Sequence, residues 1–219
     1  MAVKDNIQKD YFERINKVLL YINNNLGETM SIEKLAGIAN FSPFHFHRIL
    51  TAYLHEPLIA YIIRIRLDNA ARLLRYTAEP VNEIAYKVGY DSPSSLTKAF
   101  KKRFGVSPAE FRDQHKDLPA EGIFLKSDFS FIEIKPRIKV LESKKVVYVQ
   151  TIGKYGDENI GKAWEKITTF VKKNRLFSWK FEGIGISYDD PRITEEEKCR
   201  YEACITVNRE IKPEGETGF

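Results

Sequence analysis

The stretch that most constrains this chain is Val81–Arg112, which reads as two short helices joined by a tight turn. Ser92 and Pro93 mark the start of the second helix, because serine is a preferred N-cap and proline is tolerated at the first helical position. Apolar residues then recur on one helical face, at Leu96, Ala99, Phe100 and Phe104. The residues off that face are polar or basic: Ser94, Ser95, Thr97, Lys98, Lys101 and Lys102. A helix-turn-helix with such an outer face predicts entry into a groove of DNA.

The same pattern occurs about 50 residues earlier, so the chain carries an approximate internal repeat. Ser31 reads as the N-cap of a short helix, and Ser42-Pro43 starts the helix that follows, as Ser92-Pro93 does in the later copy. The inward positions of this second helix are Phe46, Ile49, Leu50 and Tyr53, and the outward positions are Phe44, His45, His47, Arg48 and Thr51. We therefore expect two helix-turn-helix units.

A long apolar and basic segment, residues 58–76, joins the two units and predicts a single helix. At 1.5 Å per residue this helix spans about 27 Å. That length is close to the ~34 Å turn of B-DNA, so two recognition helices could reach successive major grooves on one face of DNA. An amphipathic helix over residues 6–25 is expected to brace the units that follow.

The net charge of +5 lies mostly in the first half, with +4 on residues 1–115 and +1 on residues 116–219. This distribution is weak support for nucleic-acid binding, because many basic faces are only solvated. The chain lacks a long apolar run and an apolar N-terminal segment, which predicts no membrane association and a cytoplasmic location. No metal-ligand spacing is present, and no cofactor is expected. Cys199 and Cys204 are expected to be unpaired, partly buried thiols.

Three motifs carry a resemblance to a known family. R-x-R-L-x-x-A-x-x-L-L (64–74), I-A-x-x-V-G-Y (84–90) and S-x-x-x-x-x-x-A-F-K-K-x-F-G-x-S-P-x-x-F-R (92–112) resemble the AraC/XylS family of bacterial transcription regulators, over about residues 8–114. The first unit departs from the family pattern, because His55 and Pro57 stand where glycine and serine are usual.

The resemblance implies base contacts from both recognition helices. The positions it implies are Phe44, His47 and Arg48 in the first helix, and Pro93, Ser94, Ser95, Thr97 and Lys98 in the second. Arg48 can bind guanine through two hydrogen bonds, and Phe44 can pack on a thymine methyl group. Lys101, Lys102 and Arg103 are expected to contact phosphate or water. The alternatives are that Arg48 pairs with a nearby acid, that His45 is a packing residue, and that Arg103 is folded back into the structure.

The second half changes character. A polar segment with proline and glycine predicts a linker over residues 116–126. Apolar residues from Phe131 to Leu141, and the runs 146–153, 183–188 and 201–207, predict strands, while 159–174 predicts a helix. We therefore expect a multidomain protein, with an all-α double helix-turn-helix domain over residues 1–115 and an α+β domain of β-α-β-β order over residues 127–219.

This α+β half resembles the GyrI-like effector-binding domain. The matching residues are V-x-Y-V-x-x-x-G-x-Y, an A-W pair in the helix, and I-G-I-S-Y-D-D-P-x-x-T-x-x-E-K-x-R-Y-x-A-C-I-T-V. The family's domain is two such units in tandem and this chain has one, so the domain is expected to be incomplete and the chain to be cut at Phe219. Tyr155, Trp164 and Tyr188 are the candidate effector contacts, since flat aromatic rings suit a hydrophobic or cationic ligand. The alternative is that Trp164 is simply core.

These resemblances imply a DNA-binding transcription regulator, an activator that also touches RNA polymerase, modulated by a small-molecule effector and not an enzyme. A second possibility is a GyrI-like hydrolase of small electrophilic compounds fused to a DNA-binding domain. A third is a DNA-binding protein whose second half is only a scaffold.

Overall fold

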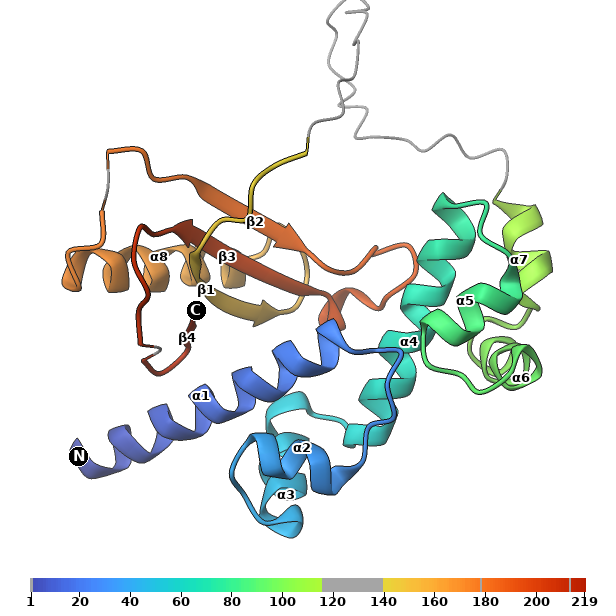
Figure 1. Cartoon of the computed structure of the whole chain (residues 1–219), viewed down its shortest axis with the longest axis horizontal. Coiled ribbons are helices and arrows are strands. Elements are labelled where there is room, and N and C mark those ends of the chain that lie inside the picture. The colour runs from blue at the N-terminus through green and yellow to red at the C-terminus, as the bar shows by residue number, and fades with distance from the viewer. Residues whose placement is uncertain (1, 116–139, 178, 213) are drawn as a thin grey trace, which may run out of the picture.

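The computed structural model describes residues 2–115, 140–177, 179–212 and 214–219, with side chains from Asp10 onward. A helical part occupies the first half of the chain, and a sheet with one long helix occupies the second half (Figure 1). Within these residues, no helix combines the length and apolar character needed to cross a membrane.

The helical part contains the predicted repeat. Its helices are α1 (Ala2–Asn24), α2 (Ile32–Ile38), α3 (Pro43–Leu54), α4 (Leu58–Tyr76), α5 (Val81–Lys87), α6 (Pro93–Phe104) and α7 (Pro108–Gln114). α2 and α3 form the first helix-turn-helix unit, and α5 and α6 form the second. A serine side chain caps each of α2, α3, α6 and α7 by accepting a hydrogen bond from the third amide of the helix. These serines are Ser31, Ser42, Ser92 and Ser107.

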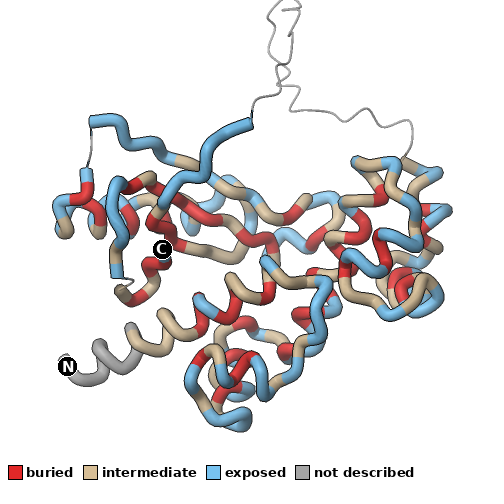
Figure 2. Tube along the Cα trace, in the orientation of Figure 1, coloured by how far each residue is buried: buried red, intermediate tan, exposed pale blue. Residues whose placement is uncertain are grey.

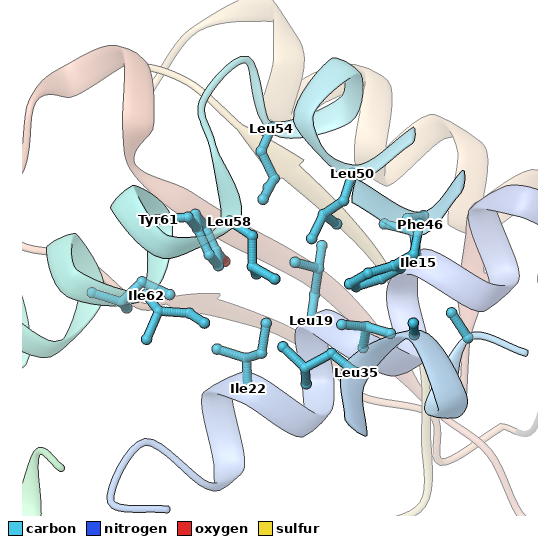
Figure 3. Packing of buried hydrophobic residues seen from close by; sticks show 14 residues of the cluster. Ile15, Leu19, Ile22, Leu35, Phe46, Leu50, Leu54, Leu58, Tyr61 and Ile62 are labelled. Carbon is cyan, nitrogen blue, oxygen red and sulfur yellow. The ribbon is translucent and has the colours of Figure 1, made fainter. Parts of the chain in front are cut away.

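Each unit has its own hydrophobic core, and α4 contributes to both. The N-terminal half of α4 packs with α1, α2 and α3, through Leu58, Tyr61, Ile62 and Ile65 (Figure 3). Its C-terminal half packs with α5, α6 and α7, through Leu67, Ala70, Ala71 and Leu74. The buried face of α4 therefore changes along its length, which is why its apolar residues do not form one simple stripe. Figure 2 shows buried residues in both units of the helical part.

The departure at His55 does not alter the helix end. His55 ends α3 in the left-handed conformation, with φ 57°, and Gly105 ends α6 in the same way, with φ 79°. The two units are therefore equivalent at this position, although a residue with a β-carbon pays a conformational cost that glycine does not.

Arg66 joins the two units. Its guanidinium donates to the carbonyl of Gly89 at 2.8 Å and to the carbonyl of Glu28 at 2.7 Å. Gly89 has φ +88°, and a β-carbon there would lie 2.3 Å from the carbonyl oxygen of Leu26 and 2.6 Å from the Arg66 guanidinium carbon. Only glycine fits this junction, because any side chain would push the two units apart.

The second part is a four-stranded sheet with α8 (Glu158–Lys173) on one face. The strands are β1 (Val146–Ile152), β2 (Gly183–Ser187), β3 (Arg200–Thr206) and β4 (Thr217–Gly218), in the order β2-β3-β1-β4. Neighbouring strands are antiparallel, and a short 3₁₀ turn, Glu196–Lys198, precedes β3. The β-α-β-β order predicted from sequence is confirmed for β1, α8, β2 and β3, and β4 is a further strand that was not predicted.

Side chains alternate across the sheet. Val147, Val149, Ala203 and Ile205 point toward α8 and pack with its buried residues. The opposite face carries Tyr148 and Glu202, among others, and lies toward α1 and α4 (Figure 1). Polar contacts join the two parts there: Arg200 donates to the Asn23 side chain, and the Asn16 amide donates to the carbonyl of Glu216 at 3.3 Å.

Two expectations for this half need correction. Val140 and Leu141 were expected in a strand, but they lie outside every described strand and are 99% and 73% exposed. The rest of that expected strand (131–139), and the linker and domain start near residues 116–127, lie outside the described residues. Cys199 and Cys204 are free as expected, but both are fully buried, and burial raises the pKa of Cys199 to about 11 and of Cys204 to about 12.

Candidate DNA-reading surface and effector face

The outer face of α3 carries the first predicted set of base contacts. Phe44 is 81% exposed, and His47 and Arg48 are also exposed, while Phe46 and Leu50 point into the core. A large apolar ring left in solvent at the start of a helix costs free energy unless a partner covers it. Exposed apolar, imidazole and guanidinium groups within one turn can together contact thymine methyl groups and base edges.

Arg48 is positioned by His45 and not by an acid. Nη2 of Arg48 lies 3.4 Å from Nδ1 of His45, whose other ring nitrogen lies 3.1 Å from the hydroxyl of Tyr11 in α1. The His45 ring also packs edge-on against Phe41, with ring centroids 5.2 Å apart. Among the described residues Arg48 makes no ion pair, so the predicted alternative of a structural Arg48–acid pair is wrong, and His45 occupies the packing position.

α6 presents the second predicted set. Ser94, Ser95, Lys98, Lys101 and Lys102 are exposed, and Thr97 is half-buried. The Thr97 hydroxyl donates to the carbonyl of Pro93 at 2.8 Å, and the Ser95 hydroxyl lies 2.9 Å from that of Ser92. Both hydroxyl groups keep the capacity to accept a hydrogen bond from a base or to bind through water. Lys98, Lys101 and Lys102 supply the positive charge.

Arg103 points the other way, as one of the alternatives predicted. Its Nε donates to Oδ1 of Asp68 at 3.0 Å, and the side chain is 20% exposed. Asp68 is 5% exposed in α4, so this pair fastens the last turn of α6 to the central helix.

Both recognition helices begin without an acid in the first turn. The positive end of each helix dipole is therefore not neutralised by a carboxylate in that turn. Such a helix start favours an approaching phosphate group.

The three predicted effector residues do not form one pocket. The Trp164 ring packs against Gly183, and its Nε1 donates to the Tyr201 hydroxyl at 3.1 Å, on the α8 side of the sheet. The Tyr155 hydroxyl lies within hydrogen-bond distance of two backbone carbonyl oxygens, 2.8 Å from that of Arg200 and 3.0 Å from that of Asp189. Both residues contribute hydrogen bonds to the sheet, and Trp164 is partly buried against its core.

Tyr188 lies on the opposite face, toward the helical part. Its hydroxyl donates to Oε2 of Glu202 at 2.8 Å. It lines a cavity of about 320 Å³ between the sheet, α1 and α4, together with Asn23, Leu26, Asn69, Arg72, Ser187 and Arg200. Among the three predicted contacts, Tyr188 is therefore the one that faces a space shared by the two parts.

Sequence reasoning missed Glu202, which is only 5% exposed in the middle of β3. Burial raises the pKa of its carboxyl group, while Tyr188 and Arg200 act in the opposite direction. A carboxylic acid buried in a strand needs partners, and the tyrosine supplies one. The signal was available: glutamate interrupts the otherwise apolar run Tyr201–Val207.

A second missed feature is the buried charge between the two parts. Arg64 in α4 donates to Oε1 of Glu56 through Nε at 3.0 Å and Nη2 at 2.6 Å. Asp189, just after β2, pairs with Arg200, and both side chains are 2% exposed. No pattern in the sequence indicates that these charged side chains are paired and buried. No group of three or more His, Cys, Asp or Glu is placed to hold a metal ion in the described part of the chain.

Comparisons with known proteins agree with this architecture. A family described as a helix-turn-helix domain matches residues 35–114, and a GyrI-like small molecule binding domain matches residues 134–218. The Transposon Tn10 TetD protein of Escherichia coli is 35% identical over 114 residues, which cover 49% of this chain and 83% of that protein. The chain belongs to the AraC/XylS family.

Other members of this AraC/XylS family are longer than the matched region. The uncharacterized HTH-type transcriptional regulator YbfP of Bacillus subtilis is 32% identical over 132 residues, covering 60% of this chain and 43% of that protein. The right origin-binding protein of Escherichia coli K12 is 34% identical over 98 residues, covering 45% of this chain and 34% of that protein. The chain thus spans less than half of these two relatives.

Solved structures also match the helical part. A crystal structure of the DNA-binding domain of AdpA in complex with a target DNA is 27% identical, with a TM-score of 0.48, and the match covers 50% of this chain and 99% of that one.

Proposed function

We propose that this AraC/XylS family member is a sequence-specific DNA-binding transcription regulator that reads two successive major grooves. The observation that carries the proposal is the pair of serine-capped, proline-started helices, α3 and α6, on one connecting helix. The base contacts in this proposal are Phe44, His47 and Arg48 from α3 and Ser94, Ser95, Thr97 and Lys98 from α6. Lys101 and Lys102 bind phosphate.

A small molecule modulates this DNA binding through the GyrI-like unit. Tyr188 is the direct contact among the predicted residues, and Glu202 beside it supplies the carboxyl group that a cation would need. Tyr155 and Trp164 stabilise the sheet through their hydrogen bonds to Arg200 and Tyr201. A flat hydrophobic cation suits this site. Burial disfavours the charged form of Glu202 in the free protein, and a bound cation would stabilise that charge.

The protein acts by binding, in the cytoplasm, and not as an enzyme. The hydrolase alternative has no support from the three relatives described above, because none of them is named as a hydrolase. The two thiols are poor nucleophiles, because burial raises their pKa values to about 11 and 12. Activation by contact with RNA polymerase is a further part of the proposal, and in vitro transcription from a selected site measures it directly.

Selection from a pool of random duplexes, followed by affinity measurement on the enriched sequence, tests DNA reading. The proposal predicts an enriched sequence bound at least 10³-fold more tightly than random DNA. Affinity that is equal for enriched and random duplexes would contradict it. For the effector, hydrophobic cations are compared with neutral molecules of the same shape in thermal unfolding. A rise in midpoint confined to the cations supports the site, and equal shifts for both series exclude it.

A further inference from the structure

The loop between β2 and β3, residues 188–199, packs against the second helix-turn-helix unit. Ile193 joins the hydrophobic core of that unit. Oδ2 of Asp190 accepts from the hydroxyl of Tyr76, at the end of α4, at 2.8 Å, and Arg192 donates to the same hydroxyl. The GyrI-like unit is thus attached to the second reading unit by apolar as well as polar contacts.

One buried carboxylate is shared between this loop and the recognition helix. Oδ1 of Asp68 accepts from Arg103 of α6, through Nε at 3.0 Å and with Nη2 at 2.8 Å. Oδ2 of Asp68 accepts from the Thr194 hydroxyl at 2.9 Å, and Thr194 is 2% exposed. Arg64 approaches Oδ2 only to 3.7 Å. The Thr194 hydroxyl is therefore the close hydrogen-bond donor that orients the Asp68 carboxylate for Arg103.

The loop is also fixed at its sheet end, next to the proposed effector contact. Asp189 follows Tyr188 directly, and its carboxylate accepts from Arg200 at 2.7 Å and 2.8 Å. The backbone of Ile193 and Thr194 turns back on Asp190, with both amides 2.8 Å from its carbonyl oxygen. Because the loop is held by its own hydrogen bonds, a displacement of Tyr188 would move the loop as a unit.

Among the described residues, the first recognition helix lacks a hydrogen-bonded link of this kind, although Ile152 of β1 packs against the core of its unit as Ile193 does against the second. Within the described part of the chain, no hydrogen bond or ion pair joins α3 to the GyrI-like unit. The position in α3 that corresponds to Arg103 holds Tyr53, which cannot pair with a carboxylate as a guanidinium does.

We infer that Asp68 and Thr194 are positioning residues for α6, and that the β2–β3 loop transmits the state of the effector face to the second reading helix rather than to the first. The DNA part of this inference rests on the proposed function. The contact between loop and helix can be tested without DNA.

The test compares Thr194→Val, which keeps the shape and removes the hydroxyl, with Thr194→Ser, which keeps the hydroxyl. The matched control is Thr206→Val in the same unit, where the hydroxyl accepts from the amide of Glu182 at 2.8 Å, away from α6. Amide hydrogen exchange is measured on the full chain. A hydrogen bond to a charged group is worth enough to change local opening by about 10-fold. We expect exchange in the last turn of α6 to rise by this factor in Thr194→Val, and to stay unchanged in Thr194→Ser, Thr206→Val and α3.

The second readout is base discrimination on the selected DNA. Thr194→Val is expected to lower discrimination about 3- to 10-fold in the half-site read by α6, with the α3 half-site unchanged and Thr194→Ser restoring the loss. The inference is overturned if amide hydrogen exchange in the last turn of α6 is unchanged in Thr194→Val. It is also overturned if base discrimination falls equally in both half-sites. If the unaltered protein selects no sequence, the proposed function fails, and the exchange result still decides whether Thr194 positions α6. If Thr194→Val unfolds and Thr194→Ser does not, Thr194 has a role in global stability alone. That result would also overturn the inference.

Discussion

At the scale of single residues, the two reading helices end in the same backbone conformation with different residues. His55 and Gly105 both have positive φ, 57° and 79°. A β-carbon at Gly105 would have no heavy atom within 4 Å, so a substitution there meets strain but no clash. The two positions therefore form a matched pair for measuring the conformational cost.

We predict that His55→Gly stabilises the chain by about 0.5–1 kcal/mol, and that Gly105→Ala destabilises it by about 1 kcal/mol. Urea denaturation of the two variants and the unaltered chain gives both values. A loss of stability in His55→Gly would show that its side chain contributes more than its backbone conformation costs.

Glu202 makes stability depend on pH in a defined direction. Burial raises the pKa of this carboxyl group in the folded chain above the ordinary value of 4.5. The folded state therefore holds the proton more strongly, so the group favours folding below about pH 4.5, and this contribution is lost as the pH rises through the folded pKa.

Glu202→Gln removes that pH-dependent term and keeps an acceptor for Tyr188. We predict that it raises the thermal midpoint at pH 7.5 and raises it less at pH 5, relative to the unaltered chain. Glu182→Gln, at an exposed pair with Lys144, is the control and should change little at either pH. A Glu202→Gln midpoint that falls equally at both pH values would contradict this account.

At the scale of elements, the proposed function assigns base contacts to α3 and α6 and phosphate contacts to the end of α6. Arg48→Ala is predicted to cost about 1–3 kcal/mol on the selected site and to relax preference for one base, because a bidentate contact to guanine is lost. Lys101→Ala should weaken selected and random DNA together and reduce the salt dependence of binding. Titrations at several salt concentrations on both kinds of DNA separate the two effects. Equal loss on both DNAs for Arg48→Ala, or an unchanged slope for Lys101→Ala, would count against these roles.

The helices and their caps could be predicted because their signals are local. Ser92-Pro93 followed by spaced apolar residues specifies the start and buried face of α6 without tertiary information. The predictions failed at positions whose surroundings are formed by distant parts of the chain. Val140 and Leu141 have the composition of a strand but lie outside every described strand. Strand pairing and core packing depend on partners that a local pattern does not show.

At the scale of the whole molecule, the packing of the two parts was not predictable from the sequence. The Asp68–Thr194 contact joins residues 126 positions apart, and the Arg200–Asn23 contact joins residues 177 apart. Each pair combines common polar side chains. Only the folded structure shows that the contact is buried, and burial strengthens a polar interaction. Glu202 is different, because an acid in an apolar strand is a signal that a sequence can give.

The length of α4 links the fold to its proposed use. It places the two units at its opposite ends, with a separate core for each. We predict that a chain built in this way reads two half-sites as one monomer, with the distance between them set by the geometry of α4 and not by dimerisation.

The measurement that tests this central claim most directly is the pattern enriched by selection from random duplexes. Two conserved half-sites about 10–10.5 base pairs apart are predicted, with affinity falling when the spacing is changed by about half a helical turn. Enrichment of a single short motif, or affinity that does not depend on spacing, would contradict a two-groove reader.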